Sequence, residues 1–148
     1  MSAIELLLEL EGAFHHEDWI ARVRGLCAPN LEFIDVGPGV RTGIDGFIEV
    51  ELTMMRAWSN VRTRQLMLVG DDTSACIELE VTATHSGPLQ WHGHSFAATG
   101  RDVSMLFARC ILVSDHSITS IRDYFNDVSF MRQHDIPVQI ADVGPVVI

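Results

Sequence analysis

The chain has 148 residues, of which 47% are hydrophobic, so it can bury the core of one domain and leaves no room for a second. Its 20 acidic and 10 basic residues give a formal net charge of -10, which disfavours nucleic acid and an anionic membrane surface as partners. The three cysteines show no close pair and no metal-binding spacing, and the acidic N-terminus lacks a basic leader. A cytoplasmic protein in a reducing compartment is therefore expected.

Helices dominate the first part of the chain. Apolar side chains recur there with helical spacing, which predicts helices over about residues 3–15, 17–26 and 43–58. Between the second and third helices, residues 31–36 alternate between apolar and polar side chains, which predicts a strand. Asp35 falls on the apolar row of this strand, so it places a charge on a face that should be buried.

Strands dominate the second part. Alternation with a period of two predicts strands over about residues 61–69, 76–85, 103–113 and 118–126, with a Gly-rich segment before the third. In the second of these strands, His85 ends the core-facing row. Ser2 can cap the first helix, and Asn126 can cap a short last helix. Helices followed by an antiparallel meander predict an α+β domain, in which a curved sheet wraps around the N-terminal helices and leaves an internal hydrophobic cavity.

We expect residues 1–135 to form this single domain and the apolar residues 136–148 to pack on it or on a partner subunit. The outward face of the strand over residues 103–113 is also apolar. A sheet that is apolar on both faces needs a cover on each side, so the sequence predicts a homodimer through the outer face of the sheet. The residues of that face are Leu106, Ala108, Cys110 and Leu112.

Two charges interrupt the apolar rows of the hairpin formed by the last two strands. Arg109 stands between Phe107 and Ile111 on one strand, and Asp123 stands between Ile121 and Phe125 on the other. A charge on a core-facing row is costly unless it is paired or lines a polar cavity. Arg109 and Asp123 are therefore the first candidate site residues.

The register of the hairpin decides whether these two charges meet. A four-residue loop Ser-Asp-His-Ser would place Arg109 opposite Arg122, and a β-bulge would restore the pairing with Asp123. We follow the apolar alternation and expect Arg109 to face Asp123. The pair can then act as a base whose pKa and orientation are set by a guanidinium, or it can be a buried structural ion pair.

Other residues are candidates with a structural alternative. His85 can shuttle protons near a pocket mouth or be a satisfied core histidine, and Asp35 can be a second acid/base or can cap the following turn. We expect the cavity to be lined by Trp19, Trp58, Trp91, Met105, Phe107 and Phe125. Trp19 and Trp58 have ordinary helix-face packing as the alternative. The histidine pairs lack a third ligand, and no nucleotide or serine-nucleophile motif occurs, so neither a metal nor a cofactor is expected.

Four segments resemble motifs of one family in order and spacing. They are Thr84-His85-Ser86-Gly87, Ala98-Thr99-Gly100-Arg101, Asp123-Tyr124-Phe125-Asn126 and Met131-Arg132-Gln133. They resemble the SnoaL-like polyketide cyclases, a family of the nuclear transport factor 2-like superfamily of cone-shaped α+β barrels. The resemblance implies a cofactor-free cavity in which a carboxylate moves a proton on a polycyclic or terpenoid-like ketone, and it places Asp123 at that position.

The chain departs from the family pattern at three positions. Ala98 stands where the family has a proline, and Asn126 stands where it has a second aspartate. Arg109 falls at the position that the resemblance aligns with a cavity histidine of the ring-closing members. The expected function is a cofactor-independent cyclase or isomerase that acts on a hydrophobic natural-product intermediate. The alternatives are an epoxide-opening enzyme, which needs two cavity acids, and a member that binds a small molecule without catalysis.

Overall fold

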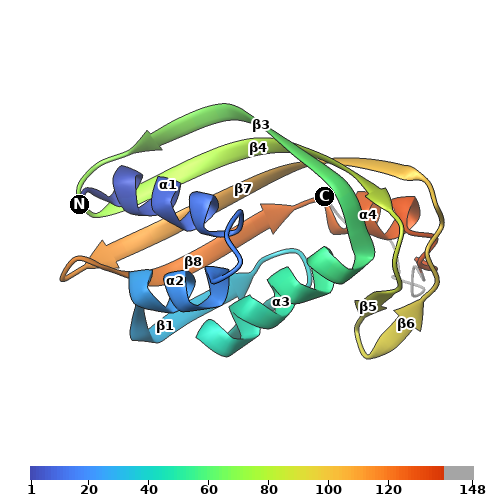
Figure 1. Ribbon diagram of the computed structural model, residues 1–148, viewed down its shortest axis with the longest axis horizontal. Helices are drawn as coiled ribbons and strands as arrows, with labels where there is room; N and C mark the ends of the chain where they lie inside the picture. The colour runs from blue at the N-terminus through green and yellow to red at the C-terminus, as the bar shows by residue number, and fades with distance from the viewer. Residues whose placement is uncertain (139–148) are drawn as a thin grey trace, which may run out of the picture.

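A curved six-stranded sheet with three helices against its concave face forms the body of the molecule (Figure 1). The computed structural model describes residues 1–138. The helices are α1 (Ala3–Ala13), α2 (Trp19–Leu26), α3 (Ile44–Ala57) and α4 (Asp127–Gln133). The sheet contains β1 (Cys27–Asp35), β2 (Val40–Thr42), β3 (Trp58–Gly70), β4 (Ser74–His85), β7 (Asp102–Ser114) and β8 (Ser117–Phe125). A separate small hairpin pairs β5 (Leu89–Trp91) with β6 (His94–Phe96).

The strand order β2-β1-β8-β7-β4-β3 brings the first and last strands of the chain together. β1 runs parallel to β8, whereas the other neighbours are antiparallel. The predicted α+β fold with a curved sheet around N-terminal helices is therefore confirmed. Two strands begin more than two residues earlier than predicted: β1 begins at Cys27 and β3 at Trp58, where each strand already pairs with a neighbour.

The predicted helix caps are present. Ser2 Oγ accepts a hydrogen bond from the Glu5 N–H, and Glu5 Oε2 accepts one from the Ser2 N–H, which completes a capping box. Asn126 Oδ1 accepts a hydrogen bond from the Ser129 N–H and caps α4. These local bonds satisfy backbone donors that a helix leaves free at its start.

The hairpin of β7 and β8 has the register that the apolar alternation predicts. Arg109 lies opposite Asp123, and the register shifts by one residue beyond Leu112, so a bulge restores the parity. The turn itself is tighter than expected. Asp115 and His116 form it alone, both with positive φ, which suits the twist of a two-residue hairpin.

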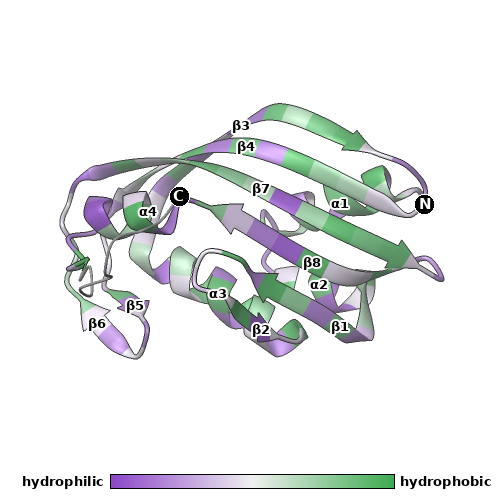
Figure 2. Ribbon diagram, turned by 180° about the vertical axis from the view of Figure 1, so that it is seen from behind, coloured by the Kyte–Doolittle hydropathy of each residue, from purple (hydrophilic) through white to green (hydrophobic). Residues whose placement is uncertain are grey.

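The core lies between the concave face of the sheet and the helices. Leu6, Leu7 and Leu10 of α1 are fully buried in one cluster with Ile111 and Ile121 of the hairpin. Within residues 1–138 no helix covers the outer face of the sheet. Figure 2, which views the molecule from behind, shows apolar and polar residues mixed on this face. None of the helices in these residues is long and apolar enough to cross a membrane.

The start of the C-terminal tail packs on the domain. Ile136 is buried in a small cluster with Ala57, Leu89 and Phe130. The rest of the tail, from residue 139, lies outside the described residues.

Candidate active site

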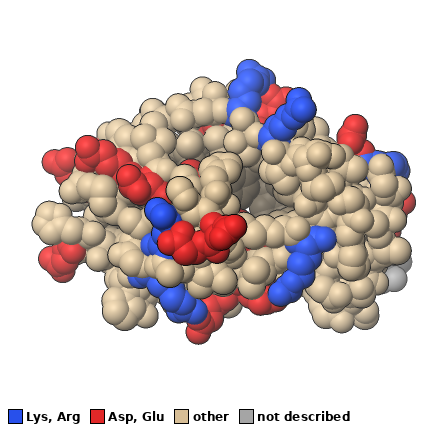
Figure 3. Space-filling view, in the orientation of Figure 1, with Lys and Arg blue, Asp and Glu red and all other residues tan. Residues whose placement is uncertain are grey.

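A cavity of about 630 Å³ lies between the concave face of the sheet, α1 and α3. Figure 3 shows the corresponding hollow in the face that carries the helices. Most of the lining is apolar or aromatic, which suits a hydrophobic small molecule. Five charged side chains interrupt it: Glu11 from α1, Asp35 from β1, Glu51 from α3, Arg109 from β7 and Asp123 from β8.

Arg109 and Asp123 form a buried, two-bond ion pair at the base of this cavity. Arg109 Nε donates to Asp123 Oδ1 over 2.8 Å, and Nη2 donates to Oδ2 over 2.8 Å. The side chains are 3% and 5% exposed. The two strands place them directly opposite one another, so the backbone register fixes this fork-to-fork geometry.

The same guanidinium reaches two helices. Arg109 Nη1 donates to Glu11 Oε1 over 2.9 Å, and Nη2 donates to Glu51 Oε1 over 2.6 Å. Its carbon Cζ also lies 4.9 to 5.6 Å from the ring centroids of three phenylalanines, Phe14, Phe47 and Phe107. Burial lowers the pKa of Arg109, but the carboxylates of Asp123, Glu11 and Glu51 outweigh it and raise that pKa well above its ordinary value.

Asp35 lies beside Asp123 because β1 and β8 are parallel neighbours in which these two residues are register partners. Its side chain is buried, and Oδ1 has no hydrogen-bond partner among the described residues. Burial, followed by repulsion from Asp123 and Asp127, raises the pKa of Asp35 from 3.8 to about 7. The site therefore contains a carboxyl group that changes protonation near neutral pH.

Glu51 is a second carboxyl group of this kind. Burial raises its pKa from 4.5 to about 7, although the adjacent Arg109 lowers it. Asp123 and Glu11 add to the increase through repulsion. Three carboxyl groups thus bind one guanidinium while Asp35 lies nearby, and burial together with the mutual repulsion of the carboxyl groups raises the pKa of Asp35 and Glu51 to about 7.

His85 lies outside the cavity, so its expected position at the pocket mouth is wrong. The side chain is fully buried, and its Nδ1 accepts a 3.3 Å hydrogen bond from the Thr99 N–H. The ring packs edge-on against His134 with a centroid distance of 4.7 Å. Burial lowers the pKa of His85 and favours the neutral ring. This placement matches a core histidine, but not a fully satisfied one, because Nε2 has no hydrogen-bond partner among the described residues.

Trp19 also lies outside the cavity, which corrects its expected contact with substrate. It is 8% exposed and packs against Phe14 in the main core, with ring centroids 5.6 Å apart. The reason is that α2 packs against α1 and β1 (Figure 1), and none of its residues lines the cavity. The other five expected lining residues do line the cavity: Trp58, Trp91, Met105, Phe107 and Phe125.

Glu11 and Glu51 are site residues that the sequence reasoning missed. Each carries the same signal that identified Arg109, a charge on an apolar row, but at helical rather than strand spacing. Glu11 follows the buried Leu7 by four residues, and Glu51 follows the buried Phe47 by four residues. Applying the test to helices as well as strands finds both.

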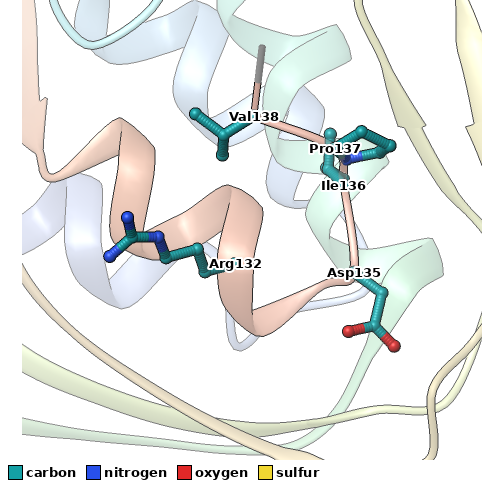
Figure 4. Close-up of a pocket in the computed structure, with 5 residues that line it drawn as sticks. All are labelled: Arg132, Asp135, Ile136, Pro137 and Val138. Carbon is teal, nitrogen blue, oxygen red and sulfur yellow. The ribbon is translucent and has the colours of Figure 1, made fainter. Parts of the chain in front are cut away.

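A second, open hollow of about 430 Å³ lies at the C-terminal end of α4. Figure 4 shows two charged residues that line it, Arg132 and Asp135, pointing away from one another. Polar groups that converge on a ligand are absent from this part of the described chain, so the hollow is not a candidate site.

Comparison with known proteins identifies the family. The profile of the SnoaL-like polyketide cyclases matches residues 5–134, which is most of the chain. The chain belongs to the SnoaL-like polyketide cyclase family. A comparison with curated proteins found no significant match.

Solved structures share the fold of this SnoaL-like protein. A candidate SnoaL-like polyketide cyclase from Jannaschia sp. CCS1 has a TM-score of 0.76 at 16% identity, covering 92% of this chain and 93% of that chain. The candidate hydroxylase AclR from Streptomyces galilaeus has a TM-score of 0.72 at 15% identity, with coverages of 93% and 83%. The candidate polyketide cyclase IdmH from Streptomyces antibioticus has a TM-score of 0.72 at 18% identity, with coverages of 90% and 98%.

Most motifs that carry the family resemblance hold the end of the barrel together instead of lining the cavity. Thr99 binds His85, and Arg101 pairs with Asp135. The Gln133 side chain accepts from the Ser104 N–H over 2.7 Å and donates to the Ser104 carbonyl over 2.8 Å. The segment that begins at Asp123 is the motif that also contributes to the cavity.

Proposed function

We propose that this SnoaL-like protein is a cofactor-independent acid/base enzyme of the cyclase or isomerase type, acting on a hydrophobic ketone of polyketide- or terpenoid-like structure. The observation that supports it most is the carboxyl group of Asp35. It lines an apolar cavity, has no hydrogen-bond partner on Oδ1 and has a pKa of about 7. General acid/base catalysis is most efficient when the pKa of the catalytic group lies near the working pH.

The geometry favours Asp35 over Asp123 as the group that moves the proton. Both oxygens of Asp123 already accept hydrogen bonds from Arg109, whereas Asp35 lines the cavity and its Oδ1 has no hydrogen-bond partner among the described residues. In this proposal Asp123 anchors Arg109, and the charge repulsion between the two aspartates tunes Asp35. The sequence predicts Asp123 for the transfer and His85 or Asp35 as the complementary acid/base, so this proposal exchanges the roles of the two aspartates.

Arg109 would stabilise the enolate or alkoxide that proton transfer produces. It makes four hydrogen bonds to Asp123, Glu11 and Glu51. A guanidinium has five N–H groups, so one remains for a substrate oxygen. A fixed cation in an apolar cavity stabilises developing negative charge without reorganising.

Deuterium exchange tests proton transfer without knowledge of the natural substrate. The protein is incubated in D₂O with 2-tetralone, a bicyclic ketone with acidic α-hydrogens, and the mass gain of the ketone is followed. We expect exchange faster than in buffer and an Asp35→Asn rate lower by about 100-fold or more. Glu32→Gln, an exposed carboxyl on the same strand, serves as the control and keeps the wild-type rate.

Two results would contradict the proposal. Exchange in Asp35→Asn at the wild-type rate would exclude Asp35 as the base. Tight binding of the ketone without any exchange by the wild type would instead favour the non-catalytic alternative, a small-molecule-binding member of the family.

Epoxide opening is the second candidate, and one observation favours it. That reaction needs two acids in one cavity, and Asp35 and Asp123 are adjacent register partners. Its test is the hydration of indene oxide in ¹⁸O-labelled water. Diol with one ¹⁸O atom formed by the wild type and lost in Asp35→Asn would support this reaction over ketone chemistry.

A further inference from the structure

The charge balance of the cavity is unusual for a site that takes a neutral hydrocarbon-like ligand. Arg109 is the one lysine or arginine among the lining residues, all of which lie within the described chain, and Glu11, Asp35, Glu51 and Asp123 surround it. Arg109 donates hydrogen bonds to Asp123, Glu11 and Glu51. Asp35 is therefore the carboxyl group of the lining that has no bond to Arg109.

Asp35 is also a built feature of the site and not a surface acid. It is 6% exposed, lines the cavity, and its Oδ1 has no partner among the described residues. Burying a carboxylate without a partner is costly, because the anion loses its hydration. A cation supplied by a ligand would remove that cost.

Aromatic side chains lie on the same side of the cavity as Asp35. Gly37, two residues after Asp35, packs so closely on Phe125 that an added Cβ would lie 3.1 Å from the ring atom Cζ. Phe125 contacts Phe130, with centroids 5.7 Å apart, and Phe130 contacts Trp91, with centroids 4.5 Å apart. Aromatic faces attract alkylammonium groups, and Arg109 is already held among three other rings.

We propose that the ligand of this cavity is a hydrophobic molecule that carries an alkylated ammonium group, held between the Asp35 carboxylate and the aromatic wall formed by Trp91, Phe125 and Phe130. The inference deepens the proposed function, since it names the substrate class of the same cavity. A neutral ring system would fill the apolar part, and the ammonium group would complete the charge balance that Arg109 leaves open.

Binding of such a cation depends on pH through the charged groups that face Asp35. These are Asp123 from β8, Asp127 from α4 and Glu51 from α3, which disfavour its ionisation, and Arg109 from β7, which favours it. With a pKa of about 7, Asp35 is mostly protonated at pH 6 and mostly ionised at pH 8. A permanent cation that prefers the ionised form therefore binds about tenfold more tightly at pH 8 than at pH 6.

A matched pair of ligands tests the proposal. Trimethyl(tetralin-2-yl)ammonium and 2-tert-butyltetralin have nearly the same shape, but only the first is charged, at every pH. Titrations follow the fluorescence of the full-length protein, because Trp58 and Trp91 line the cavity. At pH 8 we expect the ammonium compound to bind at least about tenfold more tightly than the neutral compound, a difference in binding free energy of about 1.4 kcal/mol. At pH 6 the difference in affinity between the two compounds should be smaller.

Asp35→Asn separates the proposed contact from a general effect of charge. This variant should bind 2-tert-butyltetralin as the wild type does, lose the preference for the ammonium compound and lose its pH dependence. Glu32→Gln should retain both. Circular dichroism confirms that each variant is folded.

The proposal is overturned if the neutral compound binds equally well, if neither compound binds the folded wild type, or if Asp35→Asn keeps the preference. These measurements require no turnover. If the protein exchanges 2-tetralone but shows no preference for the ammonium compound, the acid/base proposal is retained. If it prefers the ammonium compound but catalyses no exchange, only the catalytic proposal is removed.

Discussion

Replacing Asp35 by asparagine removes a buried ionisable group while nearly preserving the shape of the side chain. The pKa of Asp35 is about 7 in the folded protein, against an ordinary value of 3.8. Because the pKa is raised in the folded state, the free energy of unfolding is highest below about pH 4, where Asp35 is protonated in both states. It falls as the pH rises through about 7. Relative to low pH, the raised pKa of Asp35 therefore lowers the free energy of unfolding by roughly 2 kcal/mol at pH 5.5 and roughly 4 kcal/mol at pH 8.5.

Asp35→Asn should therefore gain stability relative to the wild type by about 2 kcal/mol between pH 5.5 and pH 8.5. The change with pH is the decisive quantity, because burial of the new amide shifts both values equally. Urea unfolding followed by circular dichroism at several pH values measures it. The exposed Glu32→Gln change on the same strand is the control and should show no such slope.

A stability difference that does not change with pH would refute the account of Asp35 as a buried carboxyl with a raised pKa. A negative slope would mean that a positively charged partner holds the group ionised. If the expected slope appears and exchange activity is lost, the chain retains a destabilising carboxyl group at its site, which is the usual sign of a functional residue.

Three further predictions test the surroundings of the site. Arg109→Met should destabilise the protein at neutral pH by about 3–5 kcal/mol in urea unfolding, because the buried Asp123 carboxylate loses both hydrogen bonds that Arg109 donates to it. A loss below about 1 kcal/mol would contradict the proposed pairing of Asp123 with Arg109. Gly37→Ala should push the Phe125 ring into the cavity and weaken ligand binding in a fluorescence titration, with a stability loss of only about 1 kcal/mol; unchanged binding would show that the ring yields elsewhere. Leu106, 59% exposed on the outer face of the sheet, should hold the proposed homodimer, so Leu106→Glu should sediment as a monomer, and a monomeric wild type at micromolar concentration would remove the hypothesis.

The location of the site on the hairpin could be predicted from the sequence, because a strand sorts its side chains to two faces with a fixed period. That period placed Arg109 and Asp123 on core-facing rows and gave more reliable register than the length of the loop. The bulge beyond Leu112 absorbed the one-residue conflict. Helical periodicity contains the corresponding signal for Glu11 and Glu51, because each charge stands one turn after a buried apolar residue.

Local patterns were misleading where long-range packing decides the position of a side chain. His85 ends a core-facing row, but that end of β4 lies beyond the cavity, against His134 and Thr99. Trp19 has the right type for a cavity wall, yet α2 carries it into the main core. In both cases the strand or helix was predicted, and its place over the sheet was not.

The sequence by itself determined the α+β class, the caps and the charged pair of the hairpin, because periodicity and capping act between residues that are near in the chain or directly opposed across a tight turn. Tertiary structure alone decided the chemistry of the site. The parallel pairing of β1 with β8 brought Asp35 beside Asp123, and α1 and α3 brought Glu11 and Glu51 to Arg109. A pKa depends on burial and on charges a few ångströms away, and the contacts that set it here join residues far apart in the chain.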